Sequence, residues 1–192
     1  KSDTECIVHA WEAWGEACVQ RLRGMFAFAL WDRNRQTLFM ARDRLGVKPL
    51  HYALLDDGML LFGSELKSVL AHGGVRRDLD PLAVEEYFAL GYVAEPRTVF
   101  KQALKLEPGH MLTWRRGDAM PRPRRFWDVT FTLDSPISEA EACEELRARL
   151  AESVRLRMIA EVPLGAFLSG GVDSSAVVAT MAGLSDRPVH TC

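Results

Sequence analysis

The stretch SGGVDSS at residues 169–175 decides the fold expected for the end of this chain. An apolar run, VPLGAFL at residues 162–168, precedes it, and a second one, AVVATMA at residues 176–182, follows it. This order predicts a strand, a tight turn and a helix. The two glycines permit a positive φ and the close approach of a ligand, because neither carries a Cβ atom. Free N–H groups and the positive dipole end of the helix attract anions, so we interpret the stretch as a phosphate-binding loop.

The stretch lacks residues that two common phosphate-binding motifs require, and this excludes both motifs. A Walker A loop has a lysine directly after its second glycine, and no lysine occurs between Leu168 and Arg187. A dinucleotide fingerprint has the pattern G-x-G-x-x-G, which the adjacent Gly170 and Gly171 do not fit. The stretch instead resembles the S-G-G-x-D-S loop of enzymes that split ATP between its α and β phosphates. A glycine-serine turn at a helix N-cap is the alternative interpretation.

The first half of the chain predicts a buried β-hairpin and carries further motifs. Residues 22–31 are almost wholly apolar, a polar turn follows at residues 32–36, and the apolar pattern resumes at residues 37–41. Next come RDRLGVKPLHY at residues 42–52 and LLFGSELKSVL at residues 60–70. Together with the loop at Ser169, these segments resemble the glutamine-hydrolysing asparagine synthetase family. The resemblance covers essentially the whole chain, and the motifs occur in the family's order.

The resemblance implies two domains. The fold class expected is an α+β sandwich of the N-terminal-nucleophile type, with αββα layers that are incomplete here. The start of an α/β, parallel-sheet ATP-pyrophosphatase domain, Rossmann-like in its layout, is expected to follow. We assign residues 1–128 to the C-terminal part of the glutaminase domain, residues 129–137 to a linker and residues 138–192 to the N-terminal part of the synthetase domain.

The two ends of the chain suggest an internal fragment. The family's first residue is a catalytic cysteine, whereas this chain opens with Lys1-Ser2-Asp3 and lacks the family's upstream Arg and Asn-Gly motifs. The chain ends at Cys192, before most of a synthetase domain. We therefore expect no catalytic residue within it. We also expect poor solubility, because a truncated domain leaves sheet edges and apolar helix faces uncovered.

Caps and periodicity predict the helices. Residues 4–19 carry apolar residues at helical spacing and predict one outer helix. Asp80 as N-cap, Pro81 at the first helical position and Gly91 at the stop predict a second helix. Ser138 and Glu141 predict a capping box. The helix that it starts is expected to pack on the sheet that delivers the loop, through the apolar residues Cys143, Leu146, Leu150 and Val154.

Candidate nucleotide-binding residues lie on and beside the loop. Ser169, Gly170, Gly171 and Ser174 are expected to supply backbone N–H and hydroxyl donors to the β and γ phosphates of ATP. The resemblance implies that Asp173 helps to hold Mg²⁺ through the nucleotide. The alternative is that Asp173 is a helix-start carboxylate stabilised by the dipole. The resemblance also implies that Leu168 contacts the adenine nucleotide through its backbone.

Asp3 is the candidate for binding glutamine. The resemblance implies that Asp3 binds the α-amino group of glutamine, and a carboxylate is a natural partner for an ammonium group. The stretch SDTE at residues 2–5 by itself predicts a helix cap, and one residue can fill both roles. For Arg42 and Asp43 we prefer a buried or interface ion pair over direct catalysis. No catalytic role is assigned to the five histidines.

Composition excludes some function classes. The net charge of −2 gives no electrostatic argument for a nucleic acid or an anionic membrane as partner. No stretch approaches the roughly 18 apolar residues of a membrane span, and no stretch of this sequence is expected to be a signal peptide. The four cysteines have no C-x-x-C spacing, so no zinc site is expected. We expect all four to be buried, inert thiols of a cytosolic, cytoplasmic protein.

The function implied by the resemblance is that of an ATP-dependent ligase with glutamine as amide donor. Glutamine would be hydrolysed in the first domain, and the second would adenylate a carboxylate with ATP and Mg²⁺ as cofactors before ammonia displaces AMP. Aspartate is the expected acceptor, which gives asparagine, and a homodimer is left open. The alternatives are a relative that adenylates another carboxylate, such as a β-lactam-forming synthetase, and a non-catalytic nucleotide-binding scaffold.

Overall fold

The computed structural model describes residues 2–115, 117–118, 121–132 and 136–192. The chain divides into two compact units, residues 1–130 and residues 131–192, and each is described by itself. None of the helices in the described ranges combines the length and the hydrophobicity of a membrane-spanning segment.

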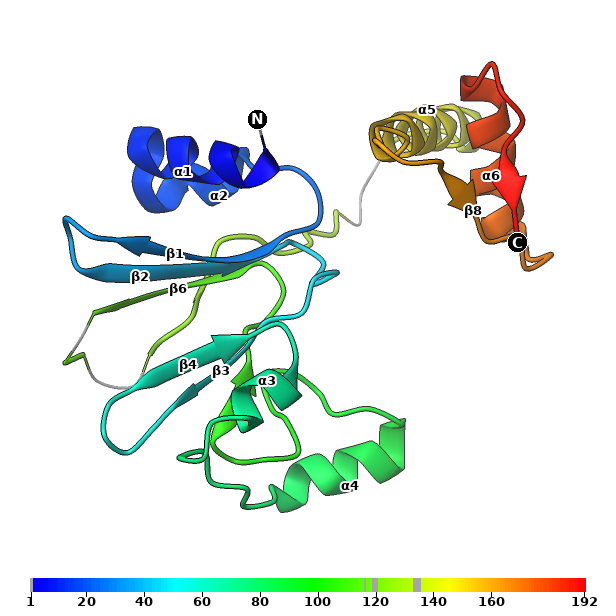
Figure 1. Cartoon of the computed structure of the whole chain (residues 1–192). Coiled ribbons are helices and arrows are strands. Elements are labelled where there is room, and N and C mark those ends of the chain that lie inside the picture. The colour runs from blue at the N-terminus through cyan, green and yellow to red at the C-terminus, as the bar shows by residue number, and fades with distance from the viewer. Residues whose placement is uncertain (1, 116, 119–120, 133–135) are drawn as a thin grey trace. The chain divides into compact units, whose positions relative to one another are not determined.

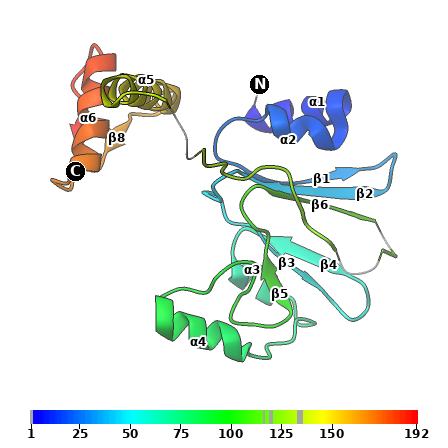
Figure 2. The ribbon, with the colours of Figure 1, turned by 180° about the vertical axis from the view of Figure 1, so that it is seen from behind.

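The first unit consists of two antiparallel sheets between helical layers (Figures 1 and 2). One sheet has the order β1-β2-β6-β7 and the other the order β4-β3-β5. The strands of the first are β1 (Ala27–Asp32), β2 (Thr37–Arg42), β6 (His110–Arg115) and β7 (Arg124–Arg125). Those of the second are β3 (His51–Leu54), β4 (Leu60–Gly63) and β5 (Ala103–Lys105). The outer elements are α1 (Asp3–Trp14), the 3-10 turn η1 (Gly15–Ala17), α2 (Cys18–Arg21), α3 (Leu66–Leu70) and α4 (Pro81–Leu90). The predicted αββα layering is confirmed.

The side chains of β2 alternate between two hydrophobic cores, one on each face of its sheet. Successive side chains of a strand point to opposite faces, and β2 is buried on both. Leu38 and Met40 pack toward the second sheet, whereas Phe39 and Ala41 pack toward the helices. The inter-sheet core also contains Leu50, Tyr52, Leu106 and Leu112, and the helix-facing core contains Ala10, Trp11, Cys18 and Val19. A third cluster joins the second sheet to α3 through Ala53, Leu55, Val69, Val75 and Ala103.

The predicted hairpin forms, but its two strands are buried to different extents. β1 and β2 pair from Ala27↔Arg42 to Asp32↔Thr37. Every residue of β2 is buried, whereas β1 is only half-buried and the side chain of Trp31 is exposed. β1 is less buried than β2 because, among the described residues, β1 has a neighbouring strand on one side only.

The helix predictions have mixed outcomes. The single helix predicted over residues 4–19 is wrong, since α1 ends at Trp14 and Gly15 takes a φ of +55°, outside the helical region. The second predicted helix is confirmed. The carboxylate of Asp80 accepts the N–H of Leu82, Pro81 starts α4, and Gly91 closes it in the left-handed conformation.

The second unit contains α5 (Glu139–Arg157), β8 (Gly165–Ala166), α6 (Val172–Leu184) and β9 (His190–Thr191). The capping box of Ser138 and Glu141 is confirmed, and β8 and β9 are parallel. The predicted packing face of α5 is largely wrong. Val154 is buried, but Cys143 is exposed and the side chain of Leu146 is 67% exposed. α5 packs against α6, because two strands of two residues are too short to cover a 19-residue helix.

Candidate functional site

Backbone pairing fixes the chain up to the start of the candidate loop. The N–H of Cys192 donates to the carbonyl of Ala166 at 3.1 Å, and the N–H of Leu168 donates to the carbonyl of Cys192 at 2.9 Å. Pairing therefore extends two residues beyond β8, although β8 itself is shorter than the strand predicted over residues 162–168. The helix begins at Val172, so Asp173, Ser174 and Ser175 lie at its start as expected. Ser169 to Gly171 thus form the whole turn between strand and helix.

The two loop glycines have different conformations. Gly170 adopts a φ of +79°, and a Cβ atom there would meet no described heavy atom within 4 Å. Gly171 is the N-cap of α6 with a φ of −76°, which any residue can adopt. Of the two glycines, Gly170 adopts the positive φ that both permit, and Gly171 does not. Gly170 alone makes the left-handed turn, and the space beside it can admit a ligand.

The start of α6 offers donors to an anion. No side chain from the described residues caps this helix, so the N–H groups of its first turn have no side-chain acceptor. The hydroxyl of Ser174 donates to the carbonyl of Gly171 at 3.1 Å and lies 3.1 Å from the hydroxyl of Ser169. The turn therefore brings both hydroxyls to the positive end of the helix dipole, an arrangement suited to a phosphate group.

Asp173 and Leu168 flank these donors. Asp173 lies in the first turn of α6 and is exposed. Over the described ranges, no group of three or more His, Cys, Asp or Glu side chains could hold a metal ion. One carboxylate fits a Mg²⁺ ion whose other ligands are phosphate oxygens and water. Because the N–H of Leu168 is bonded to Cys192, a backbone contact from Leu168 to a nucleotide would use its carbonyl oxygen.

Asp3 lies at the start of α1. The hydroxyl of Ser2 accepts the N–H of Thr4 at 3.1 Å, and Oδ1 of Asp3 accepts the same N–H at 2.8 Å. Ser2 is therefore the N-cap, and Asp3 supports it from the first turn while remaining exposed. The predicted cap is confirmed as a joint role of both residues.

Arg42 and Asp43 have different partners. Nη1 of Arg42 lies 2.6 Å from Oε1 of Glu95, so the expected ion pair is confirmed for Arg42, whereas the partners of Asp43 are backbone amides. The guanidinium also donates to the carbonyls of Gly46, Lys48 and Leu106. The buried carboxylate of Asp43 accepts the backbone N–H groups of Leu45, Val47 and Lys48. Sequence reasoning missed Glu95, because it is 53 residues from Arg42 and no local pattern links them.

The prediction for the cysteines is wrong for three of them. Cys18 is buried under the helical layer, and this burial raises the pKa of its thiol. Cys6, Cys143 and Cys192 are exposed. Cys6 and Cys143 lie on outer faces of α1 and α5, and exposure there depends on which helix face meets a neighbour.

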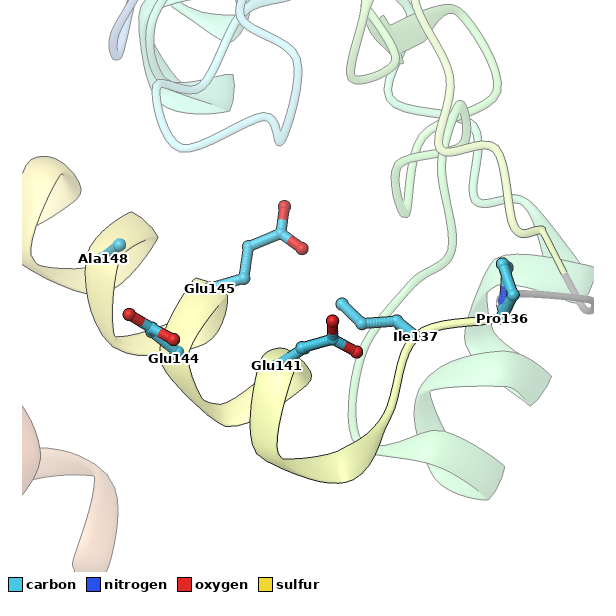
Figure 3. Close-up of a pocket in the computed structure, with 6 residues that line it drawn as sticks. All are labelled: Pro136, Ile137, Glu141, Glu144, Glu145 and Ala148. Atoms are coloured by element: carbon cyan, nitrogen blue, oxygen red, sulfur yellow. The ribbon is translucent and has the colours of Figure 1, made fainter.

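Two hollows in the second unit are poor candidates for a phosphate site. One, of about 560 Å³, lies beside the start of α5 and is lined by Glu141, Glu144 and Glu145 (Figure 3). Glu141 bonds to Ser138 and Glu145 to Arg149, and carboxylates repel phosphate. The other, of about 700 Å³, is lined by residues that precede β8 and β9, including Leu164 and Val189. It lies at the opposite end of these strands from Ser169, whereas ligands of parallel sheets bind at the carboxyl ends.

Family models match both parts of the chain. The model described as a glutamine amidotransferase domain matches residues 1–127, and the model described as asparagine synthase matches residues 145–192. The chain belongs to the glutamine-hydrolysing asparagine synthetase family. The second match contains the loop at Ser169, and the first contains Asp3 and Arg42.

Curated relatives of this family are considerably longer. Asparagine synthetase [glutamine-hydrolyzing] 3 of Bacillus subtilis (strain 168) is 39% identical over 99% of this chain and 31% of its own length. Putative asparagine synthetase [glutamine-hydrolyzing] 2 of Methanocaldococcus jannaschii is 37% identical over 99% of this chain and 37% of its own length. Amidase chyE of Penicillium rubens is 38% identical over 95% of this chain and 27% of its own length. The chain thus spans about a third of the length of these relatives.

Proposed function

We propose that the protein acts as a glutamine-dependent amidotransferase of the asparagine synthetase type. A carboxylate, with aspartate as the first candidate, would be adenylated by ATP, and ammonia released from glutamine would displace AMP to form the amide. The observation that carries the proposal is the loop at residues 169–175. Its hydrogen-bond donors lie at the start of α6, which no side chain of the described residues caps, and the space beside Gly170 is open. Membership of the family supports it.

The domain assignment is part of the proposal. Residues 1–128 would belong to the glutaminase domain, residues 129–137 to a linker and residues 138–192 to the synthetase domain. The two family matches, over residues 1–127 and 145–192, support this division. Residues 133–135 of the linker lie outside the described residues.

The loop would bind the pyrophosphate that leaves when the carboxylate is adenylated. Backbone N–H groups at the start of α6 and the hydroxyls of Ser169 and Ser174 would donate to phosphate oxygens on which negative charge accumulates. Mg²⁺ bound with the nucleotide would neutralise part of that charge, and Asp173 is the loop carboxylate available to hold it. The carbonyl of Leu168 would face the nucleotide.

Asp3 would bind the α-amino group of glutamine. Its carboxylate is exposed at the start of α1, where it also supports the helix cap through Oδ1. A charge-assisted hydrogen bond from an ammonium group to this carboxylate requires no rearrangement of the helix.

The products of ATP cleavage test the reaction class. The whole protein is supplied with ATP, Mg²⁺, glutamine and aspartate, and nucleotide products are separated by chromatography. We expect AMP and pyrophosphate in amounts equal to the asparagine formed. ADP as the product would contradict the proposal. Formation of AMP with another carboxylate, but not with aspartate, would identify a different acceptor.

Substitution of Asp173 tests its proposed role. Asp173→Asn keeps the size of the side chain and removes its charge, so aspartate-dependent release of pyrophosphate should fall by at least about tenfold, while glutamine hydrolysis is retained. The matched control is Glu139→Gln, which removes an acidic residue from the first turn of α5. If both variants keep full synthesis, Asp173 only stabilises its helix dipole, and a non-catalytic scaffold is favoured.

A further inference from the structure

His51 is a half-buried imidazole that takes no part in the proposed sites. It is the first residue of β3, the central strand of the second sheet. Nδ1 of His51 lies 3.0 Å from the backbone carbonyl oxygen of Ser64, which can only accept a hydrogen bond. Nδ1 therefore carries the proton of the neutral ring, and Nε2 is the nitrogen that takes up a proton in acid.

Two cations lie close to this ring. In the register of β3 and β5, His51 lies directly opposite Lys105, and directly opposite residues share a face of the sheet. The guanidinium of Arg42, at the end of β2, also opposes a positive charge on His51. Both cations are held in place. Nζ of Lys105 donates to the carbonyl of Val93 at 2.6 Å, and Arg42 pairs with Glu95. A second positive charge opposite Lys105 would therefore meet a cation that cannot turn away without losing its partner.

The carboxylates nearest to His51 offset these cations only in part. Glu95 favours a positive charge on His51, but its Oε1 already accepts Nη1 of Arg42. After β4 come Glu65 and Lys67, which pair with each other at 2.6 Å and so contribute little net charge. β3 and β4 themselves contain no charged residue besides His51.

The remaining charged groups at this end of the sheet have other surroundings. The carboxylate of Asp43 accepts backbone N–H groups of the turn between β2 and β3. Lys48, in the same turn, is exposed. Glu107 follows β5 and lies 3.9 Å from Nε2 of His110. These groups therefore do not supply the partner that a protonated His51 would need.

We propose that His51 is an acid-sensitive switch, which loosens the pairing of β3 with β5 when its ring is protonated. A proton on Nε2 creates a like-charge pair with Lys105, and like charges directly opposite each other destabilise paired strands. At this end the N–H of Leu106 donates to the carbonyl of Leu50 at 2.8 Å. That bond should open more often in acid and close again at neutral pH. The proposal does not depend on the proposed function.

The direction of the pKa shift agrees with this geometry. Burial and the charges of Lys105 and Arg42 lower the pKa of His51 below its ordinary value of 6.5, and the Ser64 carbonyl and Glu95 do not fully offset them. A lowered folded-state pKa means that the unfolded chain binds the proton more readily. Stability is therefore highest above pH 6.5, and part of it is lost as pH falls through the folded-state pKa.

Amide hydrogen exchange of the whole 192-residue chain at about pH 7.5 and pH 5.5 tests the switch. After correction for the intrinsic effect of pH on exchange, protection of the Leu106 amide should fall about threefold or more at the lower pH. His51→Asn does not titrate, and its amide can still donate to the Ser64 carbonyl, so its protection should be the same at both pH values. The matched control is His9→Gln, at an exposed position of α1, which should behave like the wild type.

Two results of this experiment would overturn the proposal. One is equal protection of Leu106 at both pH values in the wild type. The other is the same acid-dependent loss in His51→Asn, because another group would then be responsible.

NMR titration of the His51 ring in the unmodified chain is the second measurement, and it does not rely on a variant that folds. Its midpoint should lie below pH 6.5, and the loss of protection at Leu106 should follow the same midpoint. A midpoint at or above 6.5, or a loss of protection that follows a different midpoint, would contradict the switch.

Discussion

At the scale of single residues, the loop shows how two adjacent glycines can have different roles. Gly170 occupies the left-handed region, where a Cβ atom is strained, and it faces open space. Gly171 has an ordinary φ, and a Cβ atom added there would lie within ordinary contact distance of the two serine hydroxyls. The doublet in the sequence predicted a tight turn correctly, but which glycine turns the chain depends on where α6 begins.

Gly170→Asn separates the need for a turn from the need for ligand space. Asparagine tolerates the left-handed conformation better than most residues, so the free energy of unfolding should change by no more than about 1–2 kcal/mol. Its side chain would fill the space beside the loop, so affinity for pyrophosphate with Mg²⁺, measured by calorimetry, should fall by about tenfold or more. Unchanged affinity would mean that Gly170 serves the turn alone.

Gly171→Ala is the companion variant. Its new Cβ atom would lie 3.6 Å from the hydroxyl oxygen of Ser169 and 3.9 Å from that of Ser174, which are ordinary contacts. We therefore expect this variant to fold with native stability. Any loss of pyrophosphate binding in it would report on ligand approach and not on the turn.

At the scale of elements, local signals predicted helix starts better than helix lengths. The capping box at Ser138 and the Asp80-Pro81 start are confirmed, because each involves residues within one turn of each other. The break at Gly15 was not foreseen. It turns the chain so that Glu16 meets Thr113 and Arg124, which join η1 to β6 and β7.

The contacts of Glu16 predict an acid-dependent loss of stability. Burial alone raises the pKa of this carboxyl, but hydrogen bonds from Thr113 and Arg124 and the charge of Arg124 outweigh it, so the pKa lies below its ordinary value of 4.5. A lowered folded-state pKa stabilises the protein above the unfolded pKa, and this stabilisation is lost as pH falls through the folded pKa.

Glu16→Gln tests this contribution. The variant should unfold at lower urea concentration than the wild type at pH 7, and the difference should shrink as the pH falls below about 4.5. Urea titrations at several pH values measure it. Glu12→Gln, at an exposed site on α1, is the control and should show a smaller change at pH 7. A difference between Glu16→Gln and the wild type that is independent of pH would contradict the assignment.

At the scale of the first unit, Arg42 joins segments that are distant in sequence. Its guanidinium binds Glu95 and the carbonyls of Gly46, Lys48 and Leu106, so one buried side chain connects the end of β2, the following turn and two later segments. Such a group stabilises the fold only while all its partners remain satisfied.

Arg42→Met should therefore destabilise the first unit strongly. It leaves three carbonyls and Glu95 without their donor, and we expect a loss of about 3–5 kcal/mol in the free energy of unfolding, measured by urea titration. Arg42→Lys should be intermediate, since it keeps the charge but not the planar set of donors. The control is Arg33→Met, at an exposed turn position, which should change stability by about 0.5 kcal/mol or less. Equal effects at both sites would show that the network is dispensable.

Local patterns in the sequence predicted the loop, the caps, the hairpin and the family, because each of these depends on residues that are neighbours along the chain. The burial of individual residues and their distant partners depend on the tertiary structure. It paired Arg42 with Glu95, assigned Asp43 to backbone amides, left β1 half-buried and left Cys143 and Leu146 exposed. The physical reason is that burial and distant partners depend on which surfaces meet, and a surface consists of residues that are far apart in the sequence.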